Sequence, residues 1–208
     1  MKILEIAQGT PEWLAARAGR VTASRIPDVM AKIKTGEAAT RRDYRAQIIA
    51  EILTGQPQGD TFTNEAMRWG TEQEPFARAA YEMASGFMVD QVGFVIHPTI
   101  DRAGASPDGI VDMDGLVEIK CPKTATHIQY RLDKAVPTQY QPQMLWQMAC
   151  TGAAWCDFVS FDPRLPDDLQ LFVVRFNRDQ ARIDAMEAEV IAFLAEVDET
   201  LSRLRSAA

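Results

Sequence analysis

Residues 101–122 read DRAGASPDGIVDMDGLVEIKCP, and they place turn residues between two apolar segments. Asp114 and Gly115 form a turn dipeptide, because both residue types tolerate the positive φ angles of a tight two-residue turn. Apolar residues lie on either side of the pair. The pattern therefore predicts a β-hairpin of two strands centred on Asp114 and Gly115.

The second strand of this hairpin contains the sequence Val-Glu-Ile-Lys. Alternate residues of a strand point to the same face, so Glu118 and Lys120 are expected to project together. Val117 and Ile119 then point to the opposite face, into a core. The hairpin can bring Asp108 to the same end, where two carboxylates and one ammonium group would converge.

Such a trio has a chemical use in binding a metal ion. Mg²⁺ prefers oxygen ligands, usually one or two carboxylates together with water and substrate phosphate. A bound cation acidifies its water and neutralises charge on a phosphoryl group under attack, and Lys120 can hold that water or stabilise the developing charge. The alternative is an exposed hairpin with solvated charges, because short acidic motifs match by chance in many proteins.

Length and composition narrow the class of protein. The chain has 208 residues, which predicts one domain, 1–208, with a sizeable core. Its net charge of −7 argues against coating nucleic acid through bulk charge, although a local basic groove is compatible with it. Three cysteines without a CxxC pair, and only two histidines, favour a reduced cytosolic compartment and disfavour a zinc site. No signal peptide or membrane-spanning apolar run is visible, so we expect no membrane partner.

The segment from Thr10 to Ser24 predicts two helix N-termini. Thr10 is a good N-cap, Pro11 suits the first helical position, and Gly19 ends the helix. A second short helix is expected to begin near Ser24, and a helix N-terminus with a hydroxyl cap is a ready site for an anion. Arg17 can hold two phosphate oxygens at once, although a surface arginine and a simple cap explain the same residues.

Hydrophobic periodicity predicts further helices and strands along the chain. The predicted helices cover Arg41–Leu53, Asn64–Ala84, Thr124–Leu132, Thr138–Cys150 and Arg178–Leu204, and the predicted strands cover Val89–His97, Ala154–Asp162 and Leu169–Arg175. Gln139, Gln143 and Gln147 recur every four residues and form one polar stripe. The apolar stripe of the last helix is expected to pack on the sheet or on a neighbouring subunit.

Four ordered motifs resemble those of the phage lambda exonuclease family, or YqaJ-type viral recombinases, within the PD-(D/E)xK nuclease superfamily. They are PEWLAARAGRVTAS at 11–24, WGTEQE at 69–74, SPDG at 106–109 with EIK at 118–120, and YQPQ at 140–143. The resemblance extends from about Gln8 to about Pro163, which is most of the chain. Several motifs in one order are far more specific than a single acidic motif.

The resemblance implies an α/β fold of the restriction-endonuclease type, with a mixed central sheet flanked by helices. It also implies a Mg²⁺-dependent nuclease, for which Mn²⁺ is a possible substitute. The ligands it assigns to two metal ions are Asp108, Glu118, the backbone carbonyl of Ile119, and Glu74. Lys120 would orient or activate water. Gln143 would lie beside the metal and bond the substrate backbone or the nucleophilic water.

The same resemblance assigns contacts with DNA. The residues are Arg17, Ser24, Ser106, Lys34 and Met67. In this family the residues matching Arg17 and Ser24 bind the 5′-phosphate of the digested strand, and Ser106 is placed with them. Lys34 belongs to a loop that approaches the duplex, and Met67 occupies the place of an apolar wedge that helps to separate the terminal base pair. From the residues alone, a solvated loop and a core methionine explain Lys34 and Met67.

The implied activity is digestion of one strand of linear double-stranded DNA from its 5′ end, leaving a 3′ single-stranded tail for recombination by single-strand annealing. The resemblance further implies a homotrimeric ring, an annealing-protein partner, and a cytoplasmic location in a bacterial host of the phage or prophage. One alternative is a RecB-like or endonucleolytic nuclease of different polarity, which would cut closed circles. Another is a DNA-end-binding recombination module that has lost catalysis, and the intact trio of Asp108, Glu118 and Lys120 argues against it.

Overall fold

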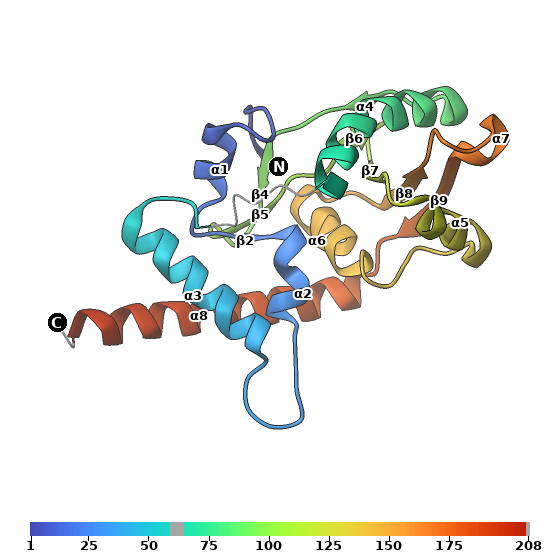
Figure 1. The fold of residues 1–208 in the computed structure, drawn as a ribbon. Helices are drawn as coiled ribbons and strands as arrows, with labels where there is room; N and C mark the ends of the chain where they lie inside the picture. Colours follow the sequence, from blue (N-terminus) through green and yellow to red (C-terminus); the bar gives the residue numbers. More distant parts are fainter. Residues whose placement is uncertain (59–64, 207–208) are drawn as a thin grey trace.

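The computed structural model of this chain describes residues 1–58 and 65–206, and Figure 1 shows its strands with helices packed around them. The strands are β1 Lys2–Leu4, β2 Val21–Thr22, β3 Val89–Asp90, β4 Phe94–Ile96, β5 Ala103–Ala105, β6 Gly109–Val111, β7 Gly115–Lys120, β8 Trp155–Phe161 and β9 Leu171–Asn177. The helices are α1 Pro11–Arg17, the 3₁₀ turn η1 Ala23–Arg25, α2 Ile26–Val29, α3 Ala39–Thr54, α4 Glu65–Ser85, α5 Thr124–Asp133, α6 Gln141–Thr151, α7 Asp167–Gln170 and α8 Gln180–Ser206. None of these described helices is long and apolar enough to cross a membrane.

The larger of two mixed sheets has the strand order β3-β6-β7-β8-β9. Strands β7 and β8 are parallel, and the other neighbours are antiparallel. Helix α6 packs on one face of this sheet and α4 on the other. The structure therefore confirms the predicted α/β fold, with a mixed central sheet flanked by helices.

A smaller sheet, in the order β1-β4-β5-β2, joins the N-terminal segment to the middle of the chain. It shows that the prediction of one strand over Val89–His97 is wrong, because β3 pairs with β6 whereas β4 pairs with β1 and β5. The break lies at Gly93, where an added Cβ would meet the carbonyl oxygen of Ile6 at 2.3 Å. Strand β5 was not predicted, because its Ala-Gly-Ala sequence has little strand preference.

The predicted hairpin is confirmed, but its turn differs. Strands β6 and β7 pair with Val111 opposite Gly115, so the turn consists of residues 112–114. The residue with a positive φ angle is Asp112, at 56°. Gly115 lies in the strand, where an added Cβ would meet the indole ring of Trp155 at 2.1 Å. The prediction that Asp114 and Gly115 supply positive φ angles is therefore wrong, and close packing explains the glycine.

Strand β7 separates two cores, as its alternating pattern predicts. Leu116 belongs to the larger core with residues of α3, α6 and α8. Val117 and Ile119 belong to the smaller core with residues of α4. The sheet thus holds Glu118 and Lys120 on the face that α6 covers, while the opposite face of the same strand is apolar.

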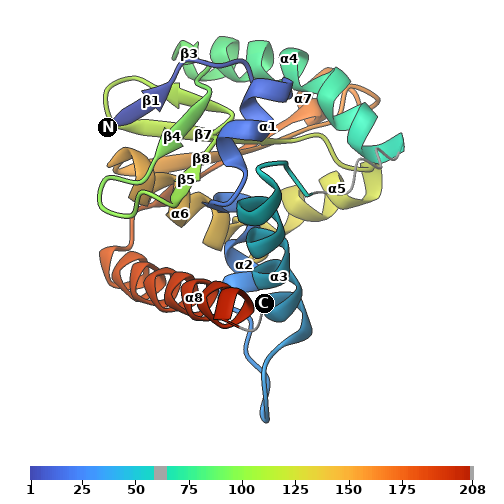
Figure 2. The same ribbon diagram turned by 90° about the vertical axis from the view of Figure 1, so that its left-hand side faces the viewer.

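Helix α8 packs on the chain itself. Its apolar stripe is buried in the larger core, among residues of α3 and α6. Figure 2 shows α8 beside α3, on the far side of the molecule from α4. Packing within one copy of the chain therefore accounts for the stripe that the sequence predicts.

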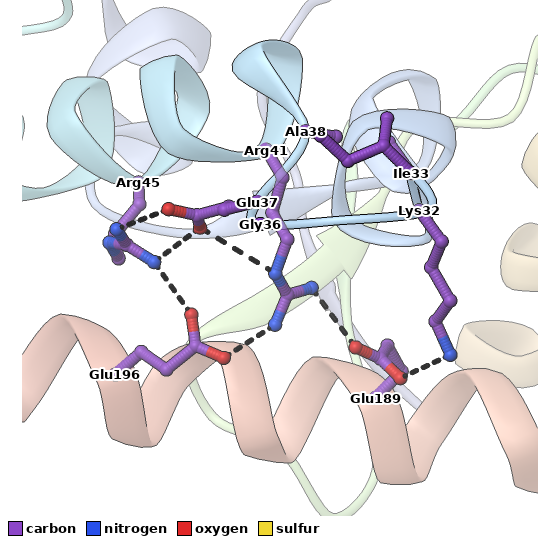
Figure 3. Close-up of a pocket in the computed structure, with 10 residues that line it drawn as sticks. Lys32, Ile33, Gly36, Glu37, Ala38, Arg41, Arg45, Glu189 and Glu196 are labelled. Carbon is purple, nitrogen blue, oxygen red and sulfur yellow. Dashed lines mark hydrogen bonds and ion pairs between the residues drawn. The ribbon is translucent and has the colours of Figure 1, made fainter.

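Charged side chains complete the contact between α3 and α8. Arg41 of α3 pairs with Glu196 at 2.6 Å and with Glu189 at 3.1 Å. Arg45 pairs with Glu37 at 2.5 Å and with Glu196 at 2.7 Å. Figure 3 shows these side chains between the two helices, beside the loop that precedes α3. The ion pairs join this loop, which contains Lys34, to the helical layer.

Candidate active site

Two carboxylates and an ammonium group meet beside β7, as the hairpin predicts. Asp108 directly precedes β6, and its Oδ2 accepts a hydrogen bond from the backbone N–H of Ile119 at 2.6 Å. Glu118 is fully buried, and its Oε1 forms an ion pair with the ammonium group of Lys120. The fold therefore brings together the three charged residues of the acidic motif.

Helix α6 directs two amide side chains at the Glu118 carboxylate. Gln143 donates from Nε2 to Oε1 at 2.7 Å, and Gln147 donates from Nε2 to Oε2 at 2.6 Å. The third member of the glutamine stripe, Gln139, precedes the helix and donates to the hydroxyl of Tyr130 at 3.3 Å. Sequence reasoning missed the part played by Gln147, although its spacing of four residues from Gln143 was the available signal.

The protonation of these groups depends on their burial and on one another. Burial and the neighbouring carboxylate of Glu118 raise the pKa of Asp108 to about 8, although the Lys120 ammonium acts in the opposite sense. Burial alone would lower the pKa of Lys120, but attraction by Glu118 and Asp108 outweighs it and raises that pKa above its usual range. Lys120 is therefore a cation, suited to stabilising negative charge and orienting water.

The donor set fits a hard divalent cation. Asp108 and Glu118 supply two carboxylates, and Mg²⁺ is usually held by one or two carboxylates with water and substrate phosphate. A cation between them would also offset the burial and the repulsion from Glu118 that together raise the pKa of Asp108. Across residues 1–58 and 65–206 there is no group of three or more His, Cys, Asp or Glu side chains that could hold a metal ion. Other ligands would therefore come from the backbone, from water or from the substrate.

Glu74 lies on α4, near this carboxylate pair. Its charge contributes to the raised pKa of Asp108, after the larger effects of burial, Glu118 and Lys120. Its carboxylate also pairs with Arg78, one helical turn onward, at 2.7 Å. Glu74 is thus a neighbour of Asp108, and Arg78 partly neutralises the charge of Glu74. The service of Glu74 to a second metal ion stays a prediction.

A small pocket adjoins the carboxylate pair on the side of α1. Its volume is about 150 Å³, and its lining residues are Gln8, Trp13, Arg17, Thr22, Ala23, Ser24, Ser106 and Gln143. The three residues predicted to bind a terminal phosphate, Arg17, Ser24 and Ser106, all belong to it. Because Gln143 also bonds Glu118, the pocket and the carboxylate pair share one side chain.

Helix α1 supplies the cation of this pocket. Thr10 caps the helix as predicted, accepting a hydrogen bond from the backbone N–H of Trp13 at 3.2 Å. The guanidinium of Arg17 stacks on the ring of Trp13 at 3.8 Å, and the indole Nε1 donates to the hydroxyl of Ser106 at 2.8 Å. Among the described residues no salt bridge engages Arg17. Trp13 was missed as a site residue, although its spacing of four from Arg17 on one helix was the signal.

Lys34 and Met67 lie apart from the pocket. Lys34 is exposed in the loop between α2 and α3, where the neighbouring Lys32 pairs with Glu189 of α8 at 3.3 Å. Met67 lies near the start of α4 and is 54% exposed, so it is not a core residue. Asn64, the predicted start of that helix, lies outside the described residues. Contact of Lys34 and Met67 with DNA stays a prediction.

A larger pocket lies where β7 leads into α5. Its volume is about 860 Å³, and its lining residues are Glu65, Ala66, Arg68, Trp69, Glu72, Cys121, Pro122, Lys123 and Arg164. Cys121 and Pro122 directly follow Lys120, so this pocket borders the carboxylate pair along the chain. The guanidinium of Arg164 lies over the ring of Trp69 at 4.5 Å. Trp69 and the basic side chains suit the bases and phosphates of a nucleic-acid strand, whereas Glu65 and Glu72 also line the pocket and Arg164 pairs with Asp162 at 2.7 Å.

Known proteins with similar sequences or structures include nucleases. Residues 12–154 match a family described as the YqaJ-like viral recombinase domain. The crystal structure of an alkaline exonuclease, LHK-Exo, from Laribacter hongkongensis is similar at 50% sequence identity and a TM-score of 0.88, over 95% of this chain and 97% of that chain. The structure of LHK-Exo in complex with dAMP gives the same values.

A more distant structure supports the fold alone. A phage-related exonuclease from Haemophilus somnus 129PT is similar at 17% sequence identity and a TM-score of 0.70, over 89% of this chain and 96% of that chain. No curated protein matches this chain.

Proposed function

Because this chain belongs to the YqaJ-like viral recombinase family, we propose that it is an exonuclease that digests one strand of linear double-stranded DNA from the 5′ end. The family and the similar alkaline exonuclease support a nuclease of the lambda exonuclease type. The proposal adds three features to this nuclease type: the 5′-to-3′ direction, the dependence on Mg²⁺ and the 3′ single-stranded tail.

The small pocket beside Glu118 is the observation that carries the proposed direction. Its volume of about 150 Å³ is below the roughly 300–1,000 Å³ that holds a drug-sized ligand, so it suits a terminal phosphate better than a whole nucleotide. Arg17 offers a guanidinium to such a phosphate, and Ser24 and Ser106 offer hydroxyl groups. A strand held there by its 5′-phosphate would present its next phosphate to the adjoining carboxylates.

The proposed reaction is hydrolysis of a phosphodiester bond. The ligands proposed for Mg²⁺, or for Mn²⁺ in its place, are Asp108, Glu118 and the carbonyl of Ile119, with Glu74 serving a second ion. Bound there, the metal would supply an acidified water and positive charge opposite the phosphate. Lys120 orients that water or stabilises the charge that develops on the phosphate. Gln143 holds Glu118 and faces the pocket, where it can bond the backbone of the strand.

The proposal extends to assembly and partners. Lys34 and Met67 are exposed, which is compatible with contact to the duplex backbone and to the terminal base pair. We propose a homotrimeric ring around double-stranded DNA, with a single-strand annealing protein receiving the 3′ tail. As the family description suggests a viral recombinase, we propose action in the cytoplasm of a bacterium that carries the phage or prophage.

Digestion of linear DNA labelled at either the 5′ or the 3′ end, with and without Mg²⁺, tests the proposal. We expect metal-dependent release of the 5′ label, retention of the 3′ label, and no cutting of covalently closed circles. Release of the 3′ label first, or cutting of circles, would support a nuclease of different polarity. Binding of ends without cleavage in either Mg²⁺ or Mn²⁺ would support a recombination module that has lost catalysis.

A further inference from the structure

We infer that Gln147 is a positioning residue that sets which oxygen of Glu118 is offered to the metal, and this inference rests on the proposed function. Gln147 lies on α6, one turn after Gln143, and is fully buried. Its Nε2 donates to Oε2 of Glu118 at 2.6 Å. Gln147 therefore acts through Glu118, from a position that a substrate strand does not reach.

The two oxygens of Glu118 are used unequally. A carboxylate offers about four acceptor sites on its two oxygens. Oε1 accepts from Gln143 at 2.7 Å and also contacts the ammonium group of Lys120, so both of its sites are engaged. Oε2 accepts from Gln147 alone among the described residues. The site left for a cation is thus on Oε2, and the amide of Gln147 fixes the direction in which it points.

The other end of the same amide supports a functional role. Oε1 of Gln147 is buried and has no hydrogen-bond partner among the described residues. The opposite orientation of the amide, with oxygen and nitrogen exchanged, would be less stable. The amide oxygen would then face Oε2 of Glu118 at 2.6 Å, and two acceptors would repel each other. A methionine or leucine would fill this buried position without an unsatisfied polar atom, and such atoms are rare in folded proteins. Support of the Glu118 carboxylate explains why an amide stands here.

Helix α6 makes Gln147 a rigid support. Trp146 and Met148, its neighbours in sequence, are fully buried in the larger core. The ring of Trp146 stacks on that of His97 with 5.0 Å between the ring centroids. An amide held on so constrained a helix restricts the rotation of the Glu118 carboxylate, which a mobile side chain would not do.

Mn²⁺ titration of the DNA-free protein, followed by the metal-dependent rise in melting temperature, tests the inference. Gln147→Met keeps the side-chain length without the amide, and Gln147→Asn withdraws the amide by one methylene group. Groups that hold metal ligands typically contribute 10–100-fold to metal affinity or activity. We therefore expect both variants, once shown to be folded by circular dichroism, to need roughly ten times more Mn²⁺ than the native protein at the midpoint. Turnover should fall, whereas DNA-end affinity measured in chelator should not change.

Met148→Ala is the matched control, because Met148 is buried next to Gln147 and forms no hydrogen bond with Glu118. It should lower the melting temperature and leave the Mn²⁺ midpoint close to the native value. A native midpoint in both Gln147 variants, with binding lost in Glu118→Gln, would overturn the inference and leave the proposed nuclease intact. A native protein that binds Mn²⁺ but digests no DNA would overturn the proposed function, while the midpoints would still decide the part played by Gln147.

Discussion

Gln143 donates a hydrogen bond to Oε1 of Glu118 at 2.7 Å and also lines the pocket that contains Arg17. One side chain thus borders both the carboxylates proposed to hold metal and the pocket proposed to hold a terminal phosphate. Because Gln143 projects from the well-packed helix α6, the spacing of these two places is set by the fold. A hydrolase with this arrangement would act next to the end of a strand, because it would locate the end and the scissile phosphate together.

Lys120→Ala should lower turnover by about 100- to 1,000-fold, the loss typical of removing one group that stabilises developing charge. The ammonium group pairs with Glu118, and its raised pKa keeps it charged. DNA-end binding, measured by fluorescence anisotropy in chelator, should stay close to that of the native protein. Lys2→Ala, which changes an exposed lysine of β1, is the control. Near-native turnover of Lys120→Ala would remove this residue from the mechanism.

Arg17→Ala should erase the preference for phosphorylated ends. The native protein should digest 5′-phosphorylated duplex at least about tenfold faster than 5′-hydroxyl duplex, because a hydrogen bond to a charged group contributes about 1.5–3 kcal/mol. Arg42→Ala is a matched control, since Arg42 is exposed and, within the part of the chain that the structure describes, its one ion pair is with the adjacent Asp43 at 2.9 Å. Equal initial rates of the native protein on the two kinds of end would contradict the phosphate pocket without contradicting the nuclease.

Arg41→Leu should lower the free energy of unfolding by about 1.5–3 kcal/mol, because it removes charged hydrogen bonds between α3 and α8. The Arg41 side chain is only 10% exposed, and the substitution leaves Glu189 and Glu196 without this partner (Figure 3). Urea denaturation measures the effect. Arg42→Leu on the exposed side of the same helix should change stability by no more than about 0.5 kcal/mol. Equal stability of the two variants would show that the cluster does not hold the helices together.

The acidic motif could be predicted because strand alternation is a local rule. Glu118 and Lys120 share a face, and Asp108 reaches the adjoining strand, wherever the hairpin lies in the fold. The contacts of Gln147 and Trp13 depend instead on how α6 and α1 pack across the sheets. Helical spacing places Gln147 with Gln143 and Trp13 with Arg17, but it does not indicate the partners Glu118 and Ser106, which are 29 and 93 residues away in sequence.

The secondary structure also divides into elements that local patterns predict and elements that depend on packing between distant segments. Long helices and the central strands follow from periodicity, because each buries one continuous face. The split between β3 and β4 does not, because the run Val89–His97 is apolar enough for one strand and the break depends on backbone atoms of Ile6 that pack against Gly93. The turn at Asp112 likewise depends on the register of β6 against β7, and Gly115 lies in the strand, where Trp155 leaves no room for a Cβ.

Chelation should stop digestion without unfolding the protein, and Mg²⁺ or Mn²⁺ should restore it. Asp108→Asn should prevent this restoration, yet leave the metal-free protein at least as stable as the native one. Ionisation of Asp108 is opposed in the folded state, so native stability without metal should fall as the pH rises from the ordinary pKa of 3.8 to about 8. The Asp108→Asn variant has no ionisable group at this position, so it should not lose stability for this reason as the pH rises. Thermal melting in chelator at pH 5 and at pH 8.5 compares the two, and an equal pH dependence would contradict a raised pKa of Asp108 caused by burial and by Glu118.

Three copies of this chain should assemble in solution, with three times the chain mass of 23.2 kDa. A globular chain of 208 residues has a radius of gyration of roughly 17 Å, so one copy can grip a duplex but hardly surround it. The net charge of −7 offers little general attraction to DNA, whereas cyclic symmetry would repeat Lys34 around one channel. The buried stripe of α8 is used in the chain's own core, so a contact between copies would use other surfaces, which include the exposed Ile191 and Leu204. Light scattering at micromolar concentration gives the mass, and digestion of long DNA with excess unlabelled competitor reports release. A stable monomer that still digests long DNA without releasing it would exclude a ring as the source of sustained contact.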